Sequence, residues 1–365
     1  MKKKHAYLHS FHSIAPKNLF AQTTLIDWVV AAHLKSQEFS GETTPNLSRL
    51  KRFAVNEVFI KKRYTEYGDS SRDWENHSIY SLTANTPYGV DIKKRNQFYT
   101  KIVTERIKEF YENKSTPDHF IHVTCTGYVS PSAPQLFFST HPQSPQITHA
   151  YHMGCYASLP AIRMARAFSL EDNKKVDVIH NEICSIHLDP SNHLPEQIVV
   201  QTLFADGHIY YQVSQEEKDL RILGIKEKII PETSSDMSWV PAPHGMSMTL
   251  SRKVPDKIED HILSFVMEMA REFEVDLAHM IKTGVFAIHP GGPRIIEVVK
   301  NKLELRDDQV LESKKILYER GNMSSATLPH VWNEILNNNY PRGTLIISLA
   351  FGPGLTVFGS IFEVV

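Results

Sequence analysis

Hydrophobic and polar positions alternate along this chain in two patterns, one with helical spacing and one of short runs rich in β-branched residues. The helical pattern predicts helices over 99–111, 157–167, 257–274, 293–303, 310–320 and 326–337. The second pattern predicts strands over 119–126, 176–186 and 285–288. Strands and helices that alternate in this way are typical of α/β layering, in which helices cover the faces of a sheet.

The longest apolar run covers 345–365. It approaches the length needed to span a membrane, but Gly352-Pro353-Gly354 interrupts it in the middle and would break a helix there. Its two halves, 345–351 and 355–365, are rich in β-branched and aromatic residues. We therefore predict two buried strands joined by a turn, and no membrane span.

Charged and turn-forming residues gather around 214–228, near the middle of the chain. A length of 365 residues is large for one simple core, so two units are expected. We predict an N-terminal half over 1–222 and a C-terminal half over 223–365.

The composition excludes several classes of function. A formal net charge of -1 provides no long-range attraction to nucleic acid or to an anionic membrane. The three cysteines, Cys125, Cys155 and Cys184, are spaced too widely to suggest a disulfide framework or a zinc site. We therefore expect reduced thiols, no bound metal and a cytoplasmic protein.

One of these cysteines lies where a thiol can act as a nucleophile. Cys155 follows Gly154 and precedes the predicted helix over 157–167. A helix N-terminus carries partial positive charge that stabilises a thiolate, so this position predicts a lowered thiol pKa. The alternative is that a single cysteine before a helix is a small core residue.

Two further segments place an imidazole and a carboxamide in similar turns. His289 precedes Pro290-Gly291-Gly292-Pro293, a tight loop that starts the predicted helix over 293–303. Asn322 follows Gly321, just before the predicted helix over 326–337. Most of the 19 histidines must be ordinary, and an asparagine here can simply cap a helix. Together with Cys155, however, His289 and Asn322 predict acyl transfer through a covalent thioester.

Four motifs of the chain resemble those of the type III polyketide synthases, the chalcone synthase family of thiolase-like condensing enzymes. They are Gly154-Cys155-Tyr156-Ala157, His289-Pro290-Gly291-Gly292-Pro293, Gly321-Asn322-Met323-Ser324-Ser325-Ala326 and Gly352-Pro353-Gly354-Leu355-Thr356-Val357. The resemblance implies a five-layered αβαβα thiolase-like fold built from two related halves, usually as a homodimer.

The same resemblance implies a reaction. Cys155 takes an acyl group from a coenzyme A or acyl carrier protein thioester, and His289 with Asn322 stabilises the enolate formed when a malonyl thioester loses CO2. A Claisen condensation on the acyl-enzyme follows. No cofactor is expected to stay bound, because the coenzyme A or phosphopantetheine thioesters are substrates. Further side chains expected to contact the substrate are Cys125, Thr126 and Ser324.

At the pocket positions the chain departs from the plant enzymes of the family. Phe204 matches one of two aromatic gatekeepers, and Met248 replaces the second with a flexible thioether that admits bulkier groups. The matching positions His187, Val200 and Trp239 carry larger residues than the plant enzymes do. An indole at 239 would remove much of the cavity, so we predict few extensions and a β-keto acid, pyrone or resorcinol-type product. If the loops are shifted by a residue, Trp239 packs elsewhere.

The end of the site that binds the carrier departs as well. The family holds the coenzyme A phosphates with basic residues of one helix, and the matching positions here are Leu50, Phe53 and Glu57, none of them basic. Lys51 and Arg52 lie close to these positions. Either these two side chains bind the phosphates with a shifted geometry, or the donor is an acyl carrier protein.

Three alternative functions remain open at this point. The nearest is a single-condensation enzyme like β-ketoacyl synthase III that uses acyl carrier protein donors. The second is a Cys-His acyltransferase or thioesterase. The third is a non-catalytic relative that serves as an interaction subunit, although the intact set of Cys155, His289 and Asn322 argues against it.

Overall fold

The computed structural model describes residues 4–39 and 47–365. In this part of the chain nine strands form one sheet with an N-terminal and a C-terminal part. The N-terminal part contains, in spatial order, β5 (Gln146–Tyr151), β4 (His119–Thr124), β6 (Val176–Ile183), β7 (Asp206–Ser214) and β1 (Tyr7–Ile14). The C-terminal part continues with β8 (Leu220–Ile229), β13 (Thr356–Val364), β12 (Leu345–Gly352) and β11 (Val285–Ile288). A short pairing of β1 with β8, at Tyr7↔Arg221 and Leu8↔Leu220, joins the two parts.

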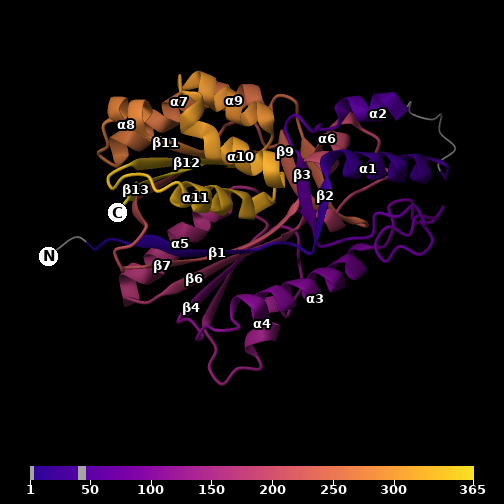
Figure 1. Cartoon of the computed structure of the whole chain (residues 1–365), viewed down its shortest axis with the longest axis horizontal. Coiled ribbons are helices and arrows are strands. Elements are labelled where there is room, and N and C mark those ends of the chain that lie inside the picture. The colour runs from indigo at the N-terminus through magenta and orange to yellow at the C-terminus, as the bar shows by residue number, and fades with distance from the viewer. Residues whose placement is uncertain (1–3, 40–46) are drawn as a thin grey trace.

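Helices cover both faces of each part and produce five layers (Figure 1). The outer face of the N-terminal part is covered by α3 (Ile92–Phe110) and α4 (Ala133–Phe138). Between the two parts lie α5 (Ser158–Asp172), which contacts β4, β6, β7 and β13, and α11 (Thr327–Asn337), which contacts β7 and β11. The outer face of the C-terminal part is covered by α7 (Val254–Glu272) and α9 (Pro293–Lys302), with α8 (Leu277–Thr283) following α7. This arrangement confirms the predicted αβαβα thiolase-like fold.

The middle layer is buried on both sides, and its sequence explains how it fits there. In α5, Ala161 and Ala165 are fully buried, and their small side chains allow the helix to approach both parts of the sheet closely. In α11, Trp332 is fully buried and its indole N–H donates a hydrogen bond to Ser348 Oγ on β12 at 2.7 Å. A buried indole needs such a partner, and here the bond ties the helix to the strand beneath it.

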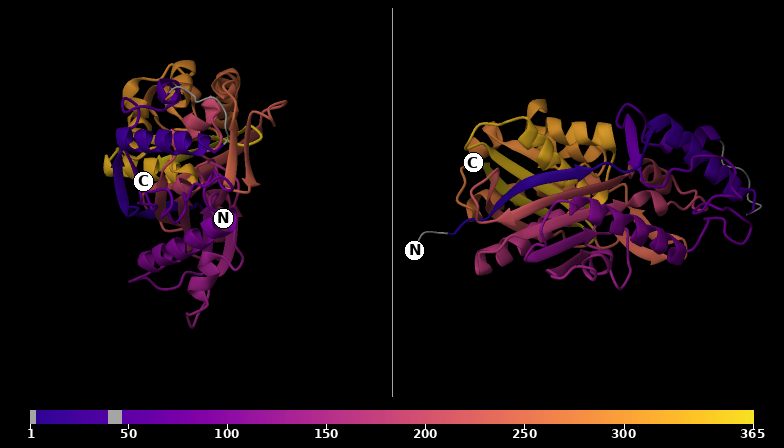
Figure 2. Two further views of the ribbon diagram at one scale, coloured as in Figure 1. Left: turned by 90° about the vertical axis from the view of Figure 1, so that its right-hand side faces the viewer. Right: turned by 60° about the horizontal axis from the view of Figure 1, so that its bottom comes forward.

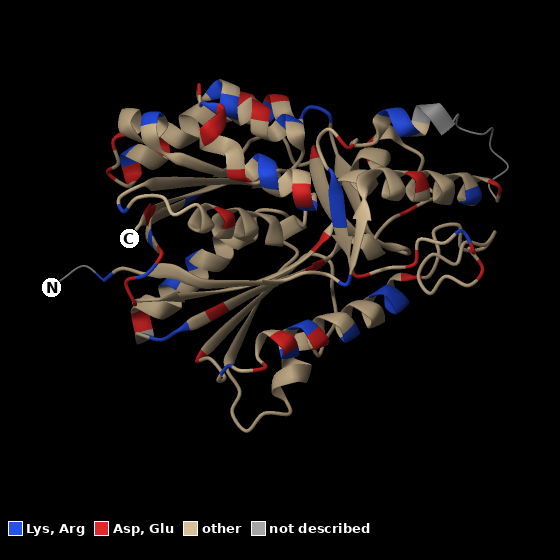
Figure 3. Cartoon of the chain, viewed as in Figure 1, with Lys and Arg blue, Asp and Glu red and all other residues tan. Residues whose placement is uncertain are grey.

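A smaller group of elements lies at one end of the sheet, on the right in Figure 1 and in the right-hand view of Figure 2. Its members are β2 (Asn18–Ala21), α1 (Gln22–Gln37), α2 (Leu47–Phe53), β3 (Lys62–Thr65), α6 (Pro195–Leu203), β9 (Met237–Ala242) and β10 (Gly245–Leu250). The C-terminus lies at the opposite end of the molecule (Figure 2). Many of the Lys, Arg, Asp and Glu residues lie on the outer helices and loops (Figure 3).

Most of the predicted elements are confirmed. The predicted C-terminal strand pair is the antiparallel ladder of β12 and β13, from Leu345↔Glu363 to Gly352↔Thr356. The predicted helix over 99–111 begins earlier, at Ile92, because the Asp91 side chain caps it by accepting a hydrogen bond from the Lys94 N–H. The remaining helix in the second half, α10 (Leu311–Arg320), agrees with its prediction.

The region 214–228 differs from the expected turn-rich boundary. Most of it is β8, in which Arg221 lies between the buried Leu220 and Ile222, and three charged residues follow one another at 226–228. The charged side chains pair with α7, as Lys226 does with Glu272 at 2.6 Å and Lys228 with Glu268 at 2.7 Å. The division of the chain at residues 222 and 223 therefore falls inside a strand, and it remains a prediction. No helix of residues 4–39 and 47–365 is both long and apolar enough to cross a membrane.

Candidate active site

The residues that directly follow several strands converge on one region. Cys125 follows β4, Cys155 lies shortly after β5, Cys184 follows β6 and His289 follows β11. β4, β5 and β6 are parallel to one another, and β11 is parallel to β12. Because the carboxyl ends of parallel strands meet at one edge of a sheet, this edge is the usual position of a ligand site in α/β folds.

A sharp turn positions Cys155 between β5 and α5. His152 and Gly154 both have positive φ angles, 58° and 80°. The Gly154 N–H donates a hydrogen bond to Cys125 Sγ at 3.1 Å. A Cβ at position 154 would lie 2.5 Å from Cδ of Pro353, so the turn requires glycine for both space and conformation. The contact also shows why Gly352-Pro353-Gly354 matters to the site, since that loop supports the turn that carries Cys155.

The thiol of Cys155 is buried and lies 3.9 Å from Ser324 Oγ. Burial raises its pKa to about 12, although hydrogen bonds from Ser324 and Asn322 act in the opposite direction. This result differs from the lowered pKa expected at a helix N-terminus, because the loss of hydration outweighs those stabilising contacts. The resting thiol is therefore protonated at neutral pH.

Asn322 is held by its backbone and by its side-chain oxygen. Its N–H donates to the Leu203 carbonyl at 3.1 Å, and its carbonyl accepts from the Ala205 N–H at 2.8 Å. Its Oδ1 accepts from the Ser324 N–H at 2.9 Å and from Thr327 Oγ1 at 3.2 Å. A backbone N–H can only donate, so this bond orients the amide and leaves Nδ2 as a donor near Cys155.

His289 is 1% exposed, and within the described chain neither of its ring nitrogens has a hydrogen-bond partner. The backbone N–H of His289 donates a hydrogen bond to the Leu349 carbonyl of β12 at 2.7 Å, and this bond fixes the backbone at the end of β11. Burial lowers its pKa to about 3, so the free imidazole is neutral. Buried polar groups are normally paired, and an unpaired imidazole that lines a cavity is suited to receive a ligand.

Cys155, His289 and Asn322 line the same cavity, which has a volume of about 480 Å3. They come from three separate segments of the chain, and the walls around them are largely apolar. Wall residues include Val55, Val199, Leu203, Leu250, Ile258, Ile295 and Phe351. The structure therefore brings the three predicted residues together, while their catalytic roles remain a prediction.

Two small pockets continue the cavity, and Phe204 and Met248 line all three spaces. The first pocket, of about 30 Å3, is lined by Cys155 together with the expected contact residues Cys125, Thr126 and Ser324. The second, of about 20 Å3, is lined by the matched positions His187, Val200 and Trp239. The predicted pocket residues thus lie next to the three chemical residues, although their contact with a substrate stays a prediction.

Trp239 and His187 fill the space beyond Cys155. The indole N–H of Trp239 donates to the Cys125 carbonyl at 2.6 Å, and its ring meets that of His187 edge to face at 5.9 Å. His187 Nδ1 accepts from the Met246 N–H at 3.1 Å, so its Nε2–H donates to the Thr126 carbonyl at 2.8 Å. These bonds fix the orientation of both rings.

Lys51 and Arg52, the predicted carrier-binding residues, lie on α2 and do not line the cavity. Lys51 Nζ instead lies 2.6 Å from Asp27 on α1. Arg252 and Arg294 are the Lys and Arg residues of the described chain that do line the cavity, and the sequence reasoning missed both. The sequence contained one signal for Arg294, because this basic residue directly follows the histidine motif.

Sequence reasoning also missed Glu182. Its fully buried carboxylate accepts hydrogen bonds from the Cys125 N–H at 3.0 Å, from Thr126 Oγ1 at 2.8 Å and from Ser325 Oγ. Burial raises its pKa. The carboxylate thereby links the end of β4 with the segment that carries Asn322. An acidic residue inside the apolar strand over 176–186 was the sign that could have revealed it.

Residues 222–365 match the family model described as "Chalcone and stilbene synthases, C-terminal domain". The matched region contains His289, Asn322 and the loop at Gly352–Gly354, but not Cys155. Over these residues the chain is similar to the C-terminal domain of the chalcone and stilbene synthases. This finding confirms the resemblance to the type III polyketide synthase family that the four motifs indicated.

Two solved structures of such synthases have the same fold. One is the C-terminal type III polyketide synthase domain of Steely1, a type I/III hybrid from Dictyostelium, with a TM-score of 0.84 and 22% identity over 99% of each chain. The other is PKS-I from the brown alga Ectocarpus siliculosus, with a TM-score of 0.85 and 19% identity over 100% of each chain. At these identities the likeness establishes the fold, whereas substrate and product have to be argued from the site.

Proposed function

We propose that this protein is a condensing enzyme of the type III polyketide synthase kind that uses Cys155 as its nucleophile. The observation that carries the proposal is one cavity in which a thiol, an unpaired imidazole and an oriented carboxamide come together. The match of residues 222–365 to the chalcone and stilbene synthases supports the same reaction class.

The first step is acyl transfer. The Cys155 proton moves to His289, the thiolate attacks the carbonyl carbon of an acyl thioester, and the carrier thiol leaves with the proton returned by the imidazolium. The pKa of about 12 for Cys155 and about 3 for His289 place the resting proton on sulfur. Deprotonation is then coupled to substrate binding, which protects the buried thiol from other electrophiles.

The second step is loss of CO2 from a malonyl thioester. The bond between the carboxylate and the central carbon breaks, and the electron pair forms an enolate whose oxygen accepts hydrogen bonds from His289 and Asn322. Both donors are neutral, so neither has to be desolvated as a charge before reaction. One such donor typically contributes about 3 kcal/mol to the transition state, roughly a hundredfold in rate.

In the third step the carbanion attacks the acyl group on Cys155, a carbon–carbon bond forms, and the thiolate departs. The space available to the product supports a small number of extensions, because Trp239 and His187 leave pockets of only about 30 and 20 Å3 beyond the nucleophile. We propose a β-keto acid, pyrone or resorcinol-type product. The same small pockets favour, as a second candidate, a single condensation like that of β-ketoacyl synthase III.

The proposal is tested by incubating the protein with acyl donors and a malonyl thioester, and measuring CO2 release and product mass. Cys155→Ala should abolish covalent acylation, whereas Cys184→Ala, at a second buried cysteine near the site, should retain it. Acyl transfer without malonyl-dependent CO2 release would instead support an acyltransferase or thioesterase. Labelling that persists in Cys155→Ala would remove the basis of the proposal.

We further propose that the enzyme is a cytoplasmic homodimer. Three free buried cysteines suit a reducing compartment.

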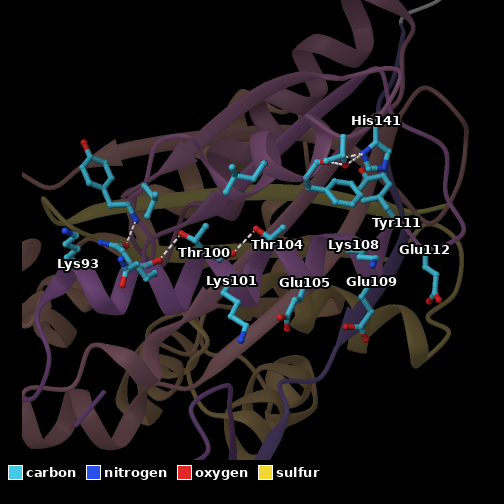
Figure 4. A pocket seen from close by; sticks show the side chains of 17 residues that line it. Lys93, Thr100, Lys101, Thr104, Glu105, Lys108, Glu109, Tyr111, Glu112 and His141 are labelled. Atoms are coloured by element: carbon cyan, nitrogen blue, oxygen red, sulfur yellow. Dashed lines mark hydrogen bonds between the residues drawn. The ribbon is translucent and has the colours of Figure 1, made fainter. Parts of the chain in front are cut away.

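Support for self-association comes from the edge of the sheet, where β5 is the terminal strand. A nearby groove of about 1460 Å3 runs along α3 and α4 (Figure 4), and it is lined by Leu136 and by Tyr128, which is 66% exposed. Sedimentation of the protein and of Tyr128→Asp tests this, and a wild-type monomer would contradict it.

A further inference from the structure

The charges that line the active-site cavity are unevenly placed. Cys155, His289 and Asn322 are buried, whereas Arg252 and Arg294 are exposed and therefore lie at its mouth. The wall between them is largely apolar, and one acidic residue, Glu196 at the start of α6, also lines the cavity. A ligand that fits this arrangement has a reactive end, an uncharged arm and an anionic end.

The two arginines lie close to the same structural element. Arg252 lies two residues before the first residue of α7, and its guanidinium lies over the ring of Phe53 at 5.9 Å from the ring centre. Arg294, in the first turn of α9, pairs with Asp256 in the first turn of α7 at 2.7 Å. The start of α7 therefore brings both cations to one side of the opening.

Both guanidinium groups are able to bind an anion. Arg252 has no ion-pair partner within residues 4–39 and 47–365, and its contact with Phe53 leaves its N–H donors free. The pair of Arg294 with Asp256 is 64% and 61% exposed, and exposed pairs of this kind contribute little, so a phosphate can replace the carboxylate. A guanidinium binds phosphate with two parallel hydrogen bonds, which a lysine cannot do.

We propose that Arg252 and Arg294 bind the phosphate at the end of a phosphopantetheine arm whose thioester reaches Cys155. This inference rests on the proposed function, since it concerns the donor of that reaction. It assigns phosphate binding to residues at the start of α7 and α9, and not to Lys51 and Arg52. Lys51 is already paired with Asp27. The phosphate belongs to coenzyme A or to a carrier protein, and both carry the same arm.

Binding is tested without catalysis, by calorimetry with 4′-phosphopantetheine and with pantetheine, which lacks the phosphate. The wild-type protein should bind the phosphorylated arm more tightly, and Arg252→Ala and Arg294→Ala should each reduce that preference by roughly 10- to 100-fold. The matched control is Arg271→Ala at the far end of α7, which should keep the preference. Equal binding of the two arms by the wild type, or loss of preference in Lys51→Ala and Arg52→Ala alone, overturns the proposal.

Kinetics then identify the source of the phosphate. If the arginine substitutions raise the KM for malonyl-coenzyme A alone, the phosphate is that of coenzyme A. If they raise the KM for a malonyl carrier protein, that carrier protein is a donor. A KM unchanged for both donors contradicts the proposal. If the wild type prefers the phosphorylated arm but releases no CO2, the proposed function fails while this binding site stands.

Discussion

Mild acid is expected to destabilise this protein strongly, because several buried histidines are held in the neutral form. Burial lowers the pKa of His122, His187, His289 and His330 to about 3 and that of His33 to about 4. In the unfolded chain each titrates near 6.5. Since the folded-state pKa is the lower one, the unfolded chain binds more protons below pH 6.5, and stability falls as the pH falls.

The size of the effect follows from these values. Each histidine lowers the free energy of unfolding by about 0.2 kcal/mol at pH 7 and about 1.4 kcal/mol at pH 5.5, so five lower it by about 6 kcal/mol between the two. Asp206 opposes this, because burial raises its pKa to about 7 and the folded state takes up its proton in the same interval. That uptake restores about 1.7 kcal/mol. The net loss of about 4 kcal/mol is a large share of a typical stability of about 5–15 kcal/mol.

The assay is urea denaturation between pH 7 and pH 5.5 at one protein concentration, followed by tryptophan fluorescence. His330→Gln, which removes one buried titrating group, should make the dependence of the unfolding free energy on pH shallower by about 0.6 proton, averaged over this interval. A free energy of unfolding that stays level over this interval would refute the reasoning. So would a His330→Gln protein with the wild-type slope, since each histidine is expected to act separately.

Three further substitutions test the site. Asn322→Ala should slow CO2 release from a malonyl donor by roughly a hundredfold, while acylation of Cys155 continues; equal loss of both would contradict its role as an enolate donor. Gly154→Ala should destabilise the protein by about 1–3 kcal/mol, because its Cβ would clash with Pro353 at a φ of 80°, and an unchanged melting temperature would show that the turn can relax. Trp239→Ala should lengthen the products seen by mass spectrometry, and products of unchanged length would show that another wall limits them.

The sequence alone determined the elements and residues whose signals are local. The strand over 285–288 and the helix that follows Gly292-Pro293 were predicted because apolar spacing and turn chemistry act within a few residues. The same holds for Cys155, His289 and Asn322, each of which lies in a turn containing or adjoining glycine. By contrast β1 was missed, since the polar residues among His9–Ser13 break the alternation that marks a strand.

Only the tertiary structure decided how these residues behave. The pKa of Cys155 is raised because segments distant in sequence remove water from the thiol, an effect that exceeds the local influence of a helix N-terminus. Arg294 reaches Asp256 at the start of α7, the helix that follows Arg252, only when α9 packs there. Desolvation and long-range packing depend on atoms that the neighbouring sequence does not contain. The motifs could therefore single out Cys155, His289 and Asn322 as candidates, but they could not give the pKa of the thiol or place Arg252 and Arg294 at the same cavity.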